Sequence, residues 1–235
     1  MGPLASAYFM MRLTLLTEAD CDQDQAPAIL WSDPRIPDRA ANIHQGGADP
    51  FPWFTDAIDK MASVGCGAIV IPCNTAHYWF DRLQRHTSLP ILHIGDATAV
   101  ELRKITPKGA AVGILGTATT LDMRLYQDRL EANGWQSVAP TAAEMDEWVM
   151  PAISMVKANR VAESYDPIAR AIASLVARGA QAVVLGCTEL PLAVQEGASE
   201  RFGIPLIDTI DALALAAIAW AKADQAEPER RVDRA

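Results

Sequence analysis

A unit of helix, glycine, strand and cysteine occurs twice in this chain of 235 residues. Residues 57–73 align without a gap with residues 171–187, at a constant offset of 187 − 73 = 114. Each copy is typical of an amphipathic helix that ends at a glycine, followed by a short buried strand that ends at Cys73 or Cys187. The repeat therefore predicts two similar α/β halves that carry a thiol at the same place in each half.

Polar residues follow both cysteines, namely Asn74 and Thr75 after the first and Thr188 and Glu189 after the second. In open α/β sheets, ligands bind outside the carboxyl ends of the strands. Two thiols facing each other across a cleft would suit a reaction that takes a proton from one face of a small molecule and returns it to the other. A single cysteine at a strand end is more often a small apolar core residue, but duplication with polar neighbours favours a functional pair.

The segments Ile71-Pro-Cys-Asn-Thr-Ala-His77 and Leu185-Gly-Cys-Thr-Glu-Leu-Pro191 resemble the two signature motifs of the aspartate/glutamate racemase family, most closely its aspartate racemase branch. The likeness extends to residues 34–39 and 1–3. It implies two Rossmann-like, flavodoxin-like halves with pseudo-twofold symmetry, each a three-layer αβα arrangement with a mainly parallel sheet. We expect residues 1–95 with 209–235 to form the first half and residues 96–208 the second.

The resemblance also implies how a substrate is held. Arg39 matches the arginine that binds the substrate carboxylate, Thr117 matches a substrate contact, and Lys157 matches a lysine for the second carboxylate of a dicarboxylic amino acid. The other expected substrate contacts are Met1, Asn74, Thr75, Thr188 and Glu189. From the residues alone, Arg39 is equally typical of a solvated loop charge, and Lys157 of a cation favoured by a helix dipole. Ile153 stands where relatives often carry a tyrosine, which leaves the substrate open.

The sequence shows no fingerprint of pyridoxal phosphate or another electron sink, so we expect no cofactor and a two-base reaction at the α-carbon. One cysteine must then be a thiolate and the other a thiol. A free thiol has a pKa of about 8.5, so we expect the turns after the two cysteines to stabilise the attacking sulfur. Cys73 and His77 alone are too few ligands for zinc, and we expect no metal. His77 either hydrogen-bonds near the thiol or caps a helix.

The charge and cysteine content narrow the class of partner. A net charge of −9 and a pI near 4.9 argue against nucleic acid and against an anionic membrane surface. The longest apolar run, residues 212–221, is shorter than the roughly 20 residues of a membrane span. Four irregularly spaced cysteines indicate reduced thiols. We expect a cytoplasmic isomerase that acts on an amino acid and has no nucleic-acid or membrane partner. A homodimer is compatible with the sequence.

Other readings stay open. Broad-specificity amino-acid racemase, glutamate racemase, hydantoin racemase and maleate isomerase share the same two-half plan. From a different class, the chain could be a thiol redox protein or a non-catalytic amino-acid-binding protein. A reversible Cys73–Cys187 disulfide would favour the redox reading, and ligand binding without proton exchange would favour the binding protein.

The local patterns predict further elements. Family members usually open with a hydrophobic strand that leads into Gly-Gly-Met-Gly-Pro, so we expect such a strand about ten residues upstream of Met1. The residues after 223 are charged, and we expect them to be frayed. Besides the strands of the repeat, strands are expected at 28–31, 89–94, 110–115, 137–140 and 204–208, and helices at 4–17, 78–85, 97–105, 121–133, 141–158 and 211–223.

Overall fold

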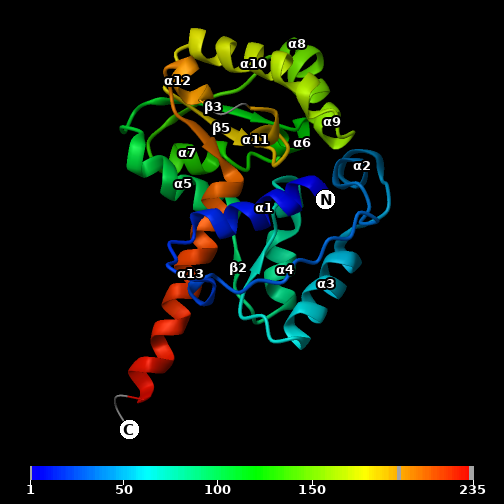
Figure 1. The fold of residues 1–235 in the computed structure, drawn as a ribbon. Helices are drawn as coiled ribbons and strands as arrows, with labels where there is room; N and C mark the ends of the chain where they lie inside the picture. Colours follow the sequence, from blue (N-terminus) through cyan, green and yellow to red (C-terminus); the bar gives the residue numbers. More distant parts are fainter. Residues whose placement is uncertain (1, 195–196, 233–235) are drawn as a thin grey trace.

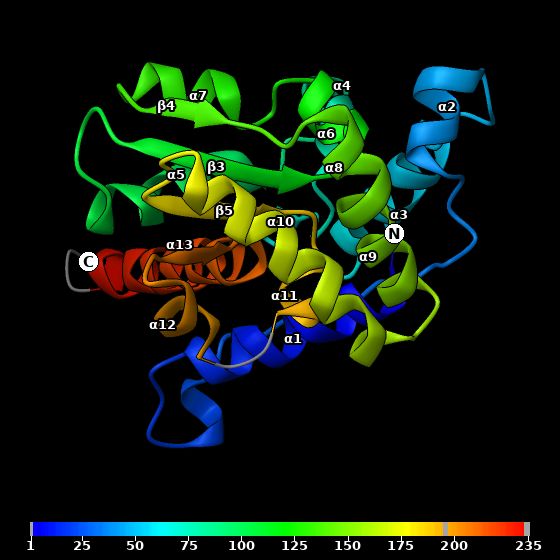
Figure 2. The same ribbon diagram turned by 90° about the horizontal axis from the view of Figure 1, so that it is seen from above.

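The computed structural model describes residues 2–194 and 197–232 and contains two parallel sheets (Figure 1). The smaller sheet pairs β1 (Ile69–Val70) with β2 (Ile91–Leu92). The larger sheet has the order β4-β3-β5-β6, and Figure 2 shows β4, β3 and β5 side by side. Its strands are β3 (Ala111–Gly116), β4 (Gln136–Val138), β5 (Ala182–Gly186) and β6 (Leu206–Asp208). The mainly parallel α/β class predicted from the repeat is confirmed.

Helices connect the strands and cover both sheets. The α-helices are α1 (Pro3–Leu16), α2 (Arg39–Gln45), α3 (Phe51–Ser63), α4 (Phe80–His86), α5 (Ile94–Ile105), α6 (Ala118–Asp122), α7 (Gln127–Ala132), α8 (Ala142–Glu144), α9 (Met150–Lys157), α10 (Tyr165–Ala177), α11 (Leu190–Ala193), α12 (Ala198–Phe202) and α13 (Thr209–Val232). The 3₁₀ segments are η1 (Asp22–Asp24), η2 (Thr75–Trp79) and η4 (Val161–Ser164), and η3 (Met145–Val149) is a π-helical turn.

The larger sheet lies between two helical layers, because successive side chains of β5 point to opposite faces. Val183 and Leu185 pack in the cluster formed with α9 and α10. Val184 packs on the other face, in the cluster formed with α1, α5, α7 and α13. This alternation produces the three-layer arrangement.

The smaller sheet is layered in the same way. Ile69 and Ile91 face a cluster built from α3 and α4, whereas Val70 and Leu92 pack against the cluster that contains α1 and α13. In Figure 1, α1 and α13 lie together where the two sheets meet. The two halves therefore share the core that these helices cover.

The repeat is preserved in detail. Helices α3 and α10 begin and end at equivalent residues, since 51 + 114 = 165 and 63 + 114 = 177. The glycines that follow them, Gly65 and Gly179, have φ angles of 87° and 89°, a conformation that a side chain disfavours. The Ile69 amide donates to the Pro90 carbonyl at 2.9 Å, and the Val183 amide, 114 residues later, donates to the Pro205 carbonyl at the same distance.

Three predicted elements differ from the structure. Residues 28–31 form no strand, because within the described residues β1 pairs only with β2 and leaves no ladder beside this segment. The predicted helix 121–133 is divided into α6 and α7, since Arg124 adopts a positive φ of 53°. The charged residues after 223 continue α13 through Val232 rather than fraying there. Most of them, the Gln, Ala, Glu and Arg residues, are good helix formers.

The predictions for Met1 and for residues 233–235 concern positions outside the described residues. Among the residues that the structure does describe, no helix combines the length and apolar character needed to cross a bilayer.

Candidate active site

Cys73 lies just beyond the carboxyl end of β1, at the edge of the first-half core, and is 9% exposed. The chain then forms η2, and this turn brings the His77 ring next to the Cys73 carbonyl. His77 Nδ1 lies 2.9 Å from the Cys73 carbonyl, and the Ile94 amide donates to His77 Nε2 at 3.1 Å. Because Nε2 accepts, Nδ1 must carry the proton and donate to the carbonyl. Burial lowers the pKa of His77 to about 4, so the ring is neutral and fixes the backbone at the thiol.

Cys187 follows β5 directly and is 5% exposed in the second-half core. Its thiol donates to Glu189 Oε2 at 3.0 Å, and the Thr188 hydroxyl donates to the same oxygen at 3.3 Å. Burial, then the charge of Glu189 and this hydrogen bond, raise the pKa of Cys187 well above its ordinary value, while Lys157 opposes the rise. The expectation that the Thr188–Glu189 turn would favour a thiolate is wrong for this sulfur, because the carboxylate stabilises the thiol.

Three buried threonines join the loops that follow β1 and β3. The Thr75 hydroxyl lies 3.2 Å from that of Thr117 and 3.3 Å from that of Thr120, and the last two are 2.9 Å apart. Thr117 also caps α6 by accepting from the Thr120 amide at 3.1 Å. The neighbouring Thr119 lies 3.0 Å from His44 Nε2. The cluster brings the polar turn of the first half to the second half.

Asn74 makes a second connection between the halves, which the sequence patterns did not reveal. The Tyr126 hydroxyl donates to Asn74 Oδ1, and Asn74 Nδ2 donates to the Thr209 hydroxyl at 3.4 Å. Thr209 in turn donates to the Leu185 carbonyl at 3.0 Å, two residues before Cys187. Burial raises the pKa of Tyr126, so its hydroxyl stays protonated and donates. A hydrogen-bonded chain thus runs from the turn after Cys73 to the strand that carries Cys187.

Two cations lie at the rim of this region. Arg39 begins α2, where Nη1 donates to the carbonyls of Pro37 at 3.0 Å and Ile36 at 3.4 Å, while its buried Nε has no partner within the described residues. Lys157 ends α9 and is exposed. Burial raises the pKa of Asp38, which caps α2. The hydrogen bond from the Ala41 amide and the charges of Arg39 and Lys157 outweigh burial and hold this pKa below its ordinary value. The charge of Lys157 thus acts on both the residue that caps α2, Asp38, and the second thiol.

The structure therefore gathers most of the expected site residues. Asn74, Thr75, Thr117, Thr188 and Glu189 are all buried around the two cysteine turns. Gly2 lies against the Glu189 carboxylate, which places the start of α1 at the same end of the strands, whereas Met1 is outside the described residues. Ile153 packs in the second-half core. The facing of the two sulfurs across one substrate stays a prediction.

Two further observations concern metal ligands and the second arginine near the site. No three His, Cys, Asp or Glu side chains within residues 2–194 and 197–232 lie close enough together to hold a metal ion. Arg35, the other arginine of the loop that precedes α2, is paired with Asp33 through Nε at 2.9 Å and Nη2 at 2.8 Å on an exposed surface. Arg39 therefore has the stronger claim to a ligand.

Solved structures and curated proteins resemble this chain. The chain is similar to the aspartate racemase of Picrophilus torridus, with a TM-score of 0.83 and 31% identity over 94% of this chain and 90% of that one. An aspartate racemase homologue from Pyrococcus horikoshii gives a TM-score of 0.73 and 25% identity over 94% of this chain and 95% of that one.

Among curated proteins, the broad specificity amino-acid racemase RacX of Bacillus subtilis is 28% identical over 162 residues, which are 68% of this chain and 66% of that protein. The glutamate racemase of Corynebacterium glutamicum is 30% identical over 139 residues, 57% of this chain and 48% of that protein. The chain thus spans no more than about two thirds of these curated relatives. The model of the family described as Asp/Glu/Hydantoin racemase matches residues 1–217, and on this evidence the chain belongs to that family.

Proposed function

We propose that the protein is a cofactor-independent racemase that interconverts L- and D-aspartate or a related amino acid, with Cys73 and Cys187 as the two bases. One observation carries the proposal. The two cysteines end equivalent strands of an internal repeat, and the polar turns that follow them are joined between the halves by the threonine cluster and by Asn74. The matched positions and the bonds between the turns support a two-sided proton transfer, which requires two similar groups near one substrate.

The proposed step begins with Cys73 as thiolate and Cys187 as thiol. The sulfur of Cys73 takes the α-proton, the C–H electron pair delocalises toward the substrate carboxylate, and the Cys187 thiol donates its proton to the opposite face of the same carbon. The reverse reaction exchanges the two roles. The raised pKa of Cys187 supports this assignment, because the resting protein keeps that sulfur protonated.

The rim cations supply the charge that an anionic substrate needs. The unpaired Nε of Arg39 is a donor for a carboxylate, and Lys157 supplies a positive charge close to Cys187. Fixed cations also stabilise the negative charge that develops as the proton leaves. A dicarboxylic amino acid places one carboxylate for each cation.

The decisive experiment is incubation with L- or D-aspartate in heavy water, following α-deuteration and chirality together. The proposal predicts that each enantiomer gains deuterium as it inverts. Neither exchange nor inversion with aspartate, glutamate or a panel of other amino acids would refute racemisation, and inversion by both single cysteine variants at the wild-type rate would refute the two-base step.

A broader substrate range is the second candidate. The similarity to the broad specificity racemase of Bacillus subtilis favours it, and so does Ile153, an apolar side chain of the second-half core at a place where relatives often carry a tyrosine. A chiral assay over neutral, basic and acidic amino acids separates the two candidates. Preference for acidic side chains that disappears in Lys157→Ala would favour the dicarboxylate reading.

A further inference from the structure

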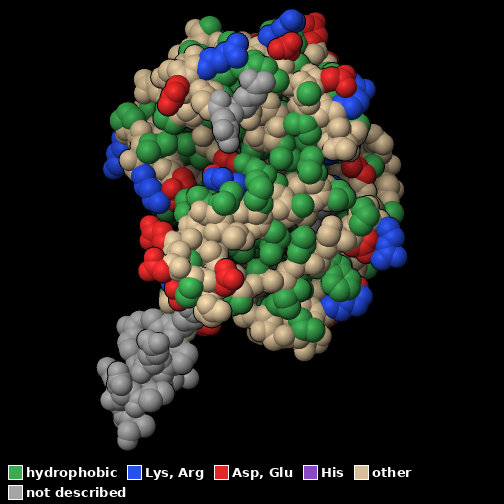
Figure 3. Space-filling view, viewed as in Figure 1, with side chains coloured by type: hydrophobic (Ala, Val, Ile, Leu, Met, Phe, Trp, Pro, Cys, Tyr) green, Lys and Arg blue, Asp and Glu red, His purple; other side chains and the backbone are tan. Residues whose placement is uncertain are grey.

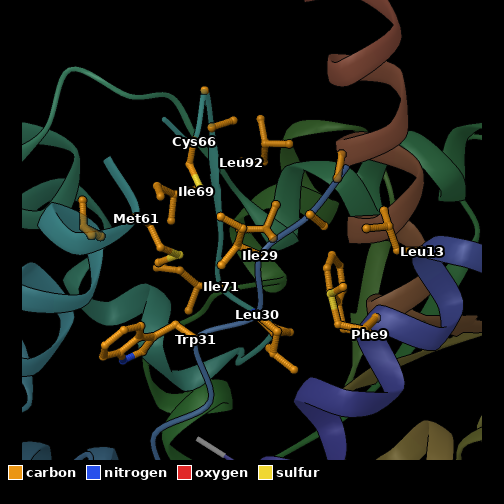
Figure 4. A pocket seen from close by; sticks show the side chains of 18 of the residues that line it. Phe9, Leu13, Ile29, Leu30, Trp31, Met61, Cys66, Ile69, Ile71 and Leu92 are labelled. Carbon is orange, nitrogen blue, oxygen red and sulfur yellow. The ribbon is translucent and has the colours of Figure 1, made fainter. Parts of the chain in front are cut away.

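Two cavities of similar size within the described residues differ in their chemistry. The first, of about 500 Å³, is apolar, and Figure 4 shows Phe9 and Leu13 of α1 on one side of it and Met61 and Ile69 on the other. Figure 3 shows hydrophobic side chains gathered on this lower part of the surface. Among the described residues that line this cavity, only Asp224 is charged, so it offers a ligand little besides apolar surface.

The second cavity, of about 460 Å³, lies where η2 and α4 meet the segments around the starts of α5 and α7. Its volume is within the range of about 300 to 1,000 Å³ that is usual for small-molecule sites. None of the expected substrate-binding residues that the structure describes lines it, and neither cysteine of the proposed pair does. The cavity is therefore distinct from the expected substrate contacts.

Two hydrogen-bond donors face each other in this second cavity. Burial lowers the pKa of His93 to about 2, and Nδ1 of the neutral ring accepts from the Gly95 amide at 3.0 Å, so the ring proton is on Nε2. Arg129 Nη2, which can only donate, lies 2.9 Å from this Nε2 and 3.1 Å from Nδ1, whose lone pair the amide already occupies. Arg129 uses its other nitrogens on Asp96, at 2.6 Å, and on the Leu125 carbonyl, at 2.9 Å. A carboxylate beside Nη2 and Nε2 would accept both remaining protons.

Gly95 allows the guanidinium to lie where it does. A Cβ at this position would be 2.7 Å from Arg129 Nε and 2.8 Å from Arg129 Cδ, which is closer than such atoms approach in proteins. The absence of a side chain therefore lets Arg129 cross the first turn of α5 and reach His93. Because Asp96 holds the same guanidinium, the two donors are positioned before a ligand arrives.

The acidic part of the lining favours a zwitterion over a simple anion. Three carboxylates line the cavity, and two of them are paired, Asp96 with Arg129 and Asp128 with Arg124. Asp81 has no ion-pair partner among residues 2–194 and 197–232. An inorganic anion would meet all three negative charges, whereas an amino acid brings an ammonium group for Asp81 together with a carboxylate for the donors.

We propose that this cavity binds an α-amino acid with an apolar side chain. Its carboxylate would accept from Arg129 Nη2 and His93 Nε2, and its ammonium group would face Asp81. The side chain would lie against the apolar part of the lining, to which Phe80 and Met123 belong.

The packing of aromatic rings connects this cavity to the first cysteine turn. The His93 ring packs edge-on against the His77 ring, with centroids 4.6 Å apart. His77 in turn accepts from the Ile94 amide and donates to the Cys73 carbonyl. A ligand that holds His93 in place also restrains His77 and the backbone at Cys73. The cavity is thus an effector site for the cysteine turn.

Calorimetric titration of the whole chain with L-phenylalanine, L-leucine and L-methionine tests the site. Phenethylamine lacks the carboxylate and 3-phenylpropanoate lacks the ammonium group, so each should bind at least about tenfold more weakly than L-phenylalanine. Bound L-phenylalanine should also slow hydrogen exchange of the Ile94 amide. Equal affinity for L-phenylalanine and its two analogues, or no binding of the three amino acids up to about 10 mM, would overturn the proposal.

Two variants test the assigned contacts. Asp81→Asn should weaken L-phenylalanine by at least about tenfold and leave 3-phenylpropanoate unchanged. Arg129→Lys should weaken both, because lysine keeps the charge but not the planar fork. Asp146→Asn and Arg103→Lys, outside the cavity, are the matched controls and should bind like the wild type. Asp81 is exposed, so its variant is informative even if Arg129→Lys does not fold. Wild-type affinity in Asp81→Asn would overturn the assignment.

Arg39→Ala separates this site from the substrate site. L-phenylalanine should bind this variant as tightly as the wild type, whether or not the protein racemises aspartate. Loss of binding in Arg39→Ala would place the ligand at the substrate contacts and overturn the proposal. Unchanged exchange of the Ile94 amide at saturating L-phenylalanine would overturn the connection to the cysteine turn.

Discussion

The two cysteine turns occupy equivalent places but differ in their hydrogen bonds. At the repeat offset, Cys187 corresponds to Cys73 and Glu189 corresponds to Thr75. A carboxylate accepts from the Cys187 thiol, whereas the hydroxyl of Thr75 bonds to Thr117 and Thr120 instead of to a sulfur. The difference teaches that a duplicated fold can carry a chemically asymmetric pair, in which one thiol donates to a carboxylate while the residue at the equivalent place in the other turn bonds elsewhere.

Removing either thiol should have the largest effect on activity. Cys73→Ala and Cys187→Ala should each lower kcat for racemisation by at least about a thousandfold, because each variant lacks one of the two proton-transfer groups. The asymmetry predicts that the two variants retain α-deuterium exchange from opposite enantiomers. Cys66→Ala is the matched control and should keep wild-type turnover. Identical residual exchange from both enantiomers in both variants would contradict the assignment of separate faces.

Glu189→Gln should reduce the asymmetry between the two thiols. Losing the negative charge removes one cause of the raised pKa of Cys187, so that pKa should fall toward its ordinary value. In the direction in which Cys187 donates, the alkaline limb of the kcat/KM profile should therefore move to lower pH, with a rate loss of about 10- to 100-fold at its optimum. The exposed Glu147→Gln is the control. An unmoved alkaline limb would show that Glu189 does not govern this proton.

Tyr126→Phe tests the connection between the halves. It removes the hydroxyl that donates to Asn74 while keeping the buried ring, so kcat should fall by about 3- to 30-fold and the free energy of unfolding by about 1 to 2 kcal/mol. A purely structural role would lower stability but leave kcat of the folded enzyme unchanged. Tyr78→Phe, on an exposed ring, is the matched control.

Local determinants explain which elements the sequence predicts well. Gly65 and Gly179 end their helices as expected, because a positive φ is a property of a single residue and its neighbours. The Thr141–Glu144 capping box at the start of α8 is a local signal of the same kind, since both of its hydrogen bonds join residues three apart. These signals are complete within a few residues of chain, so no distant contact is needed to read them.

Contacts between distant segments explain the misses. Tyr126 lies in a segment whose apolar spacing predicts only a helix, and nothing local indicates that its hydroxyl reaches Asn74, 52 residues away. Residues 28–31 have the composition of a strand, but a strand needs a neighbour to pair with. The candidate site was predictable where the repeat marks it, at both cysteines and their turns, and not where it depends on how the halves pack.

His77 has no equivalent in the second half, where Pro191 stands at the same offset. His77→Ala removes the bond to the Cys73 carbonyl and the acceptor for the Ile94 amide, so it should lower the free energy of unfolding by about 2 to 4 kcal/mol at pH 7. Folding favours the neutral form of His77, because its pKa is about 4 in the folded protein and 6.5 when the ring is exposed. That stabilisation is present above about pH 6.5 and is lost as pH falls toward 4.

The measurement is urea unfolding of both proteins between pH 4 and 7.5. His93, Arg129 and Asp96 face the same ring and stay in both proteins, so the difference between the two curves isolates His77. The gap between wild type and His77→Ala should narrow as pH falls below 6.5. A gap that is constant over the whole range would contradict a neutral, buried imidazole.

The smallest predicted effect compares two helix caps. His93 ends the segment after β2 and accepts from the Gly95 amide at 3.0 Å, and Asp208 ends β6 and accepts from the Ile210 amide at 2.7 Å. Burial lowers the pKa of His93 to about 2, whereas burial and Asp211 raise that of Asp208 to about 7. A carboxyl whose folded pKa exceeds its unfolded value costs stability as pH rises from about 4 to 7, so its contribution runs opposite to that of His93.

Asp208→Asn keeps an oxygen for the Ile210 amide and removes the titration. Relative to wild type, the variant should gain on the order of 1 to 2 kcal/mol in free energy of unfolding between pH 4 and pH 8, measured by urea denaturation at both values. Tyr8 donates to Asp208 at 3.2 Å, and Tyr8→Phe controls for the loss of that bond without removing the carboxyl. If the free energies of unfolding of Asp208→Asn and wild type change in parallel with pH, Asp208 is ionised at both pH values. The two caps would then differ in residue type but not in the sign of their pH dependence.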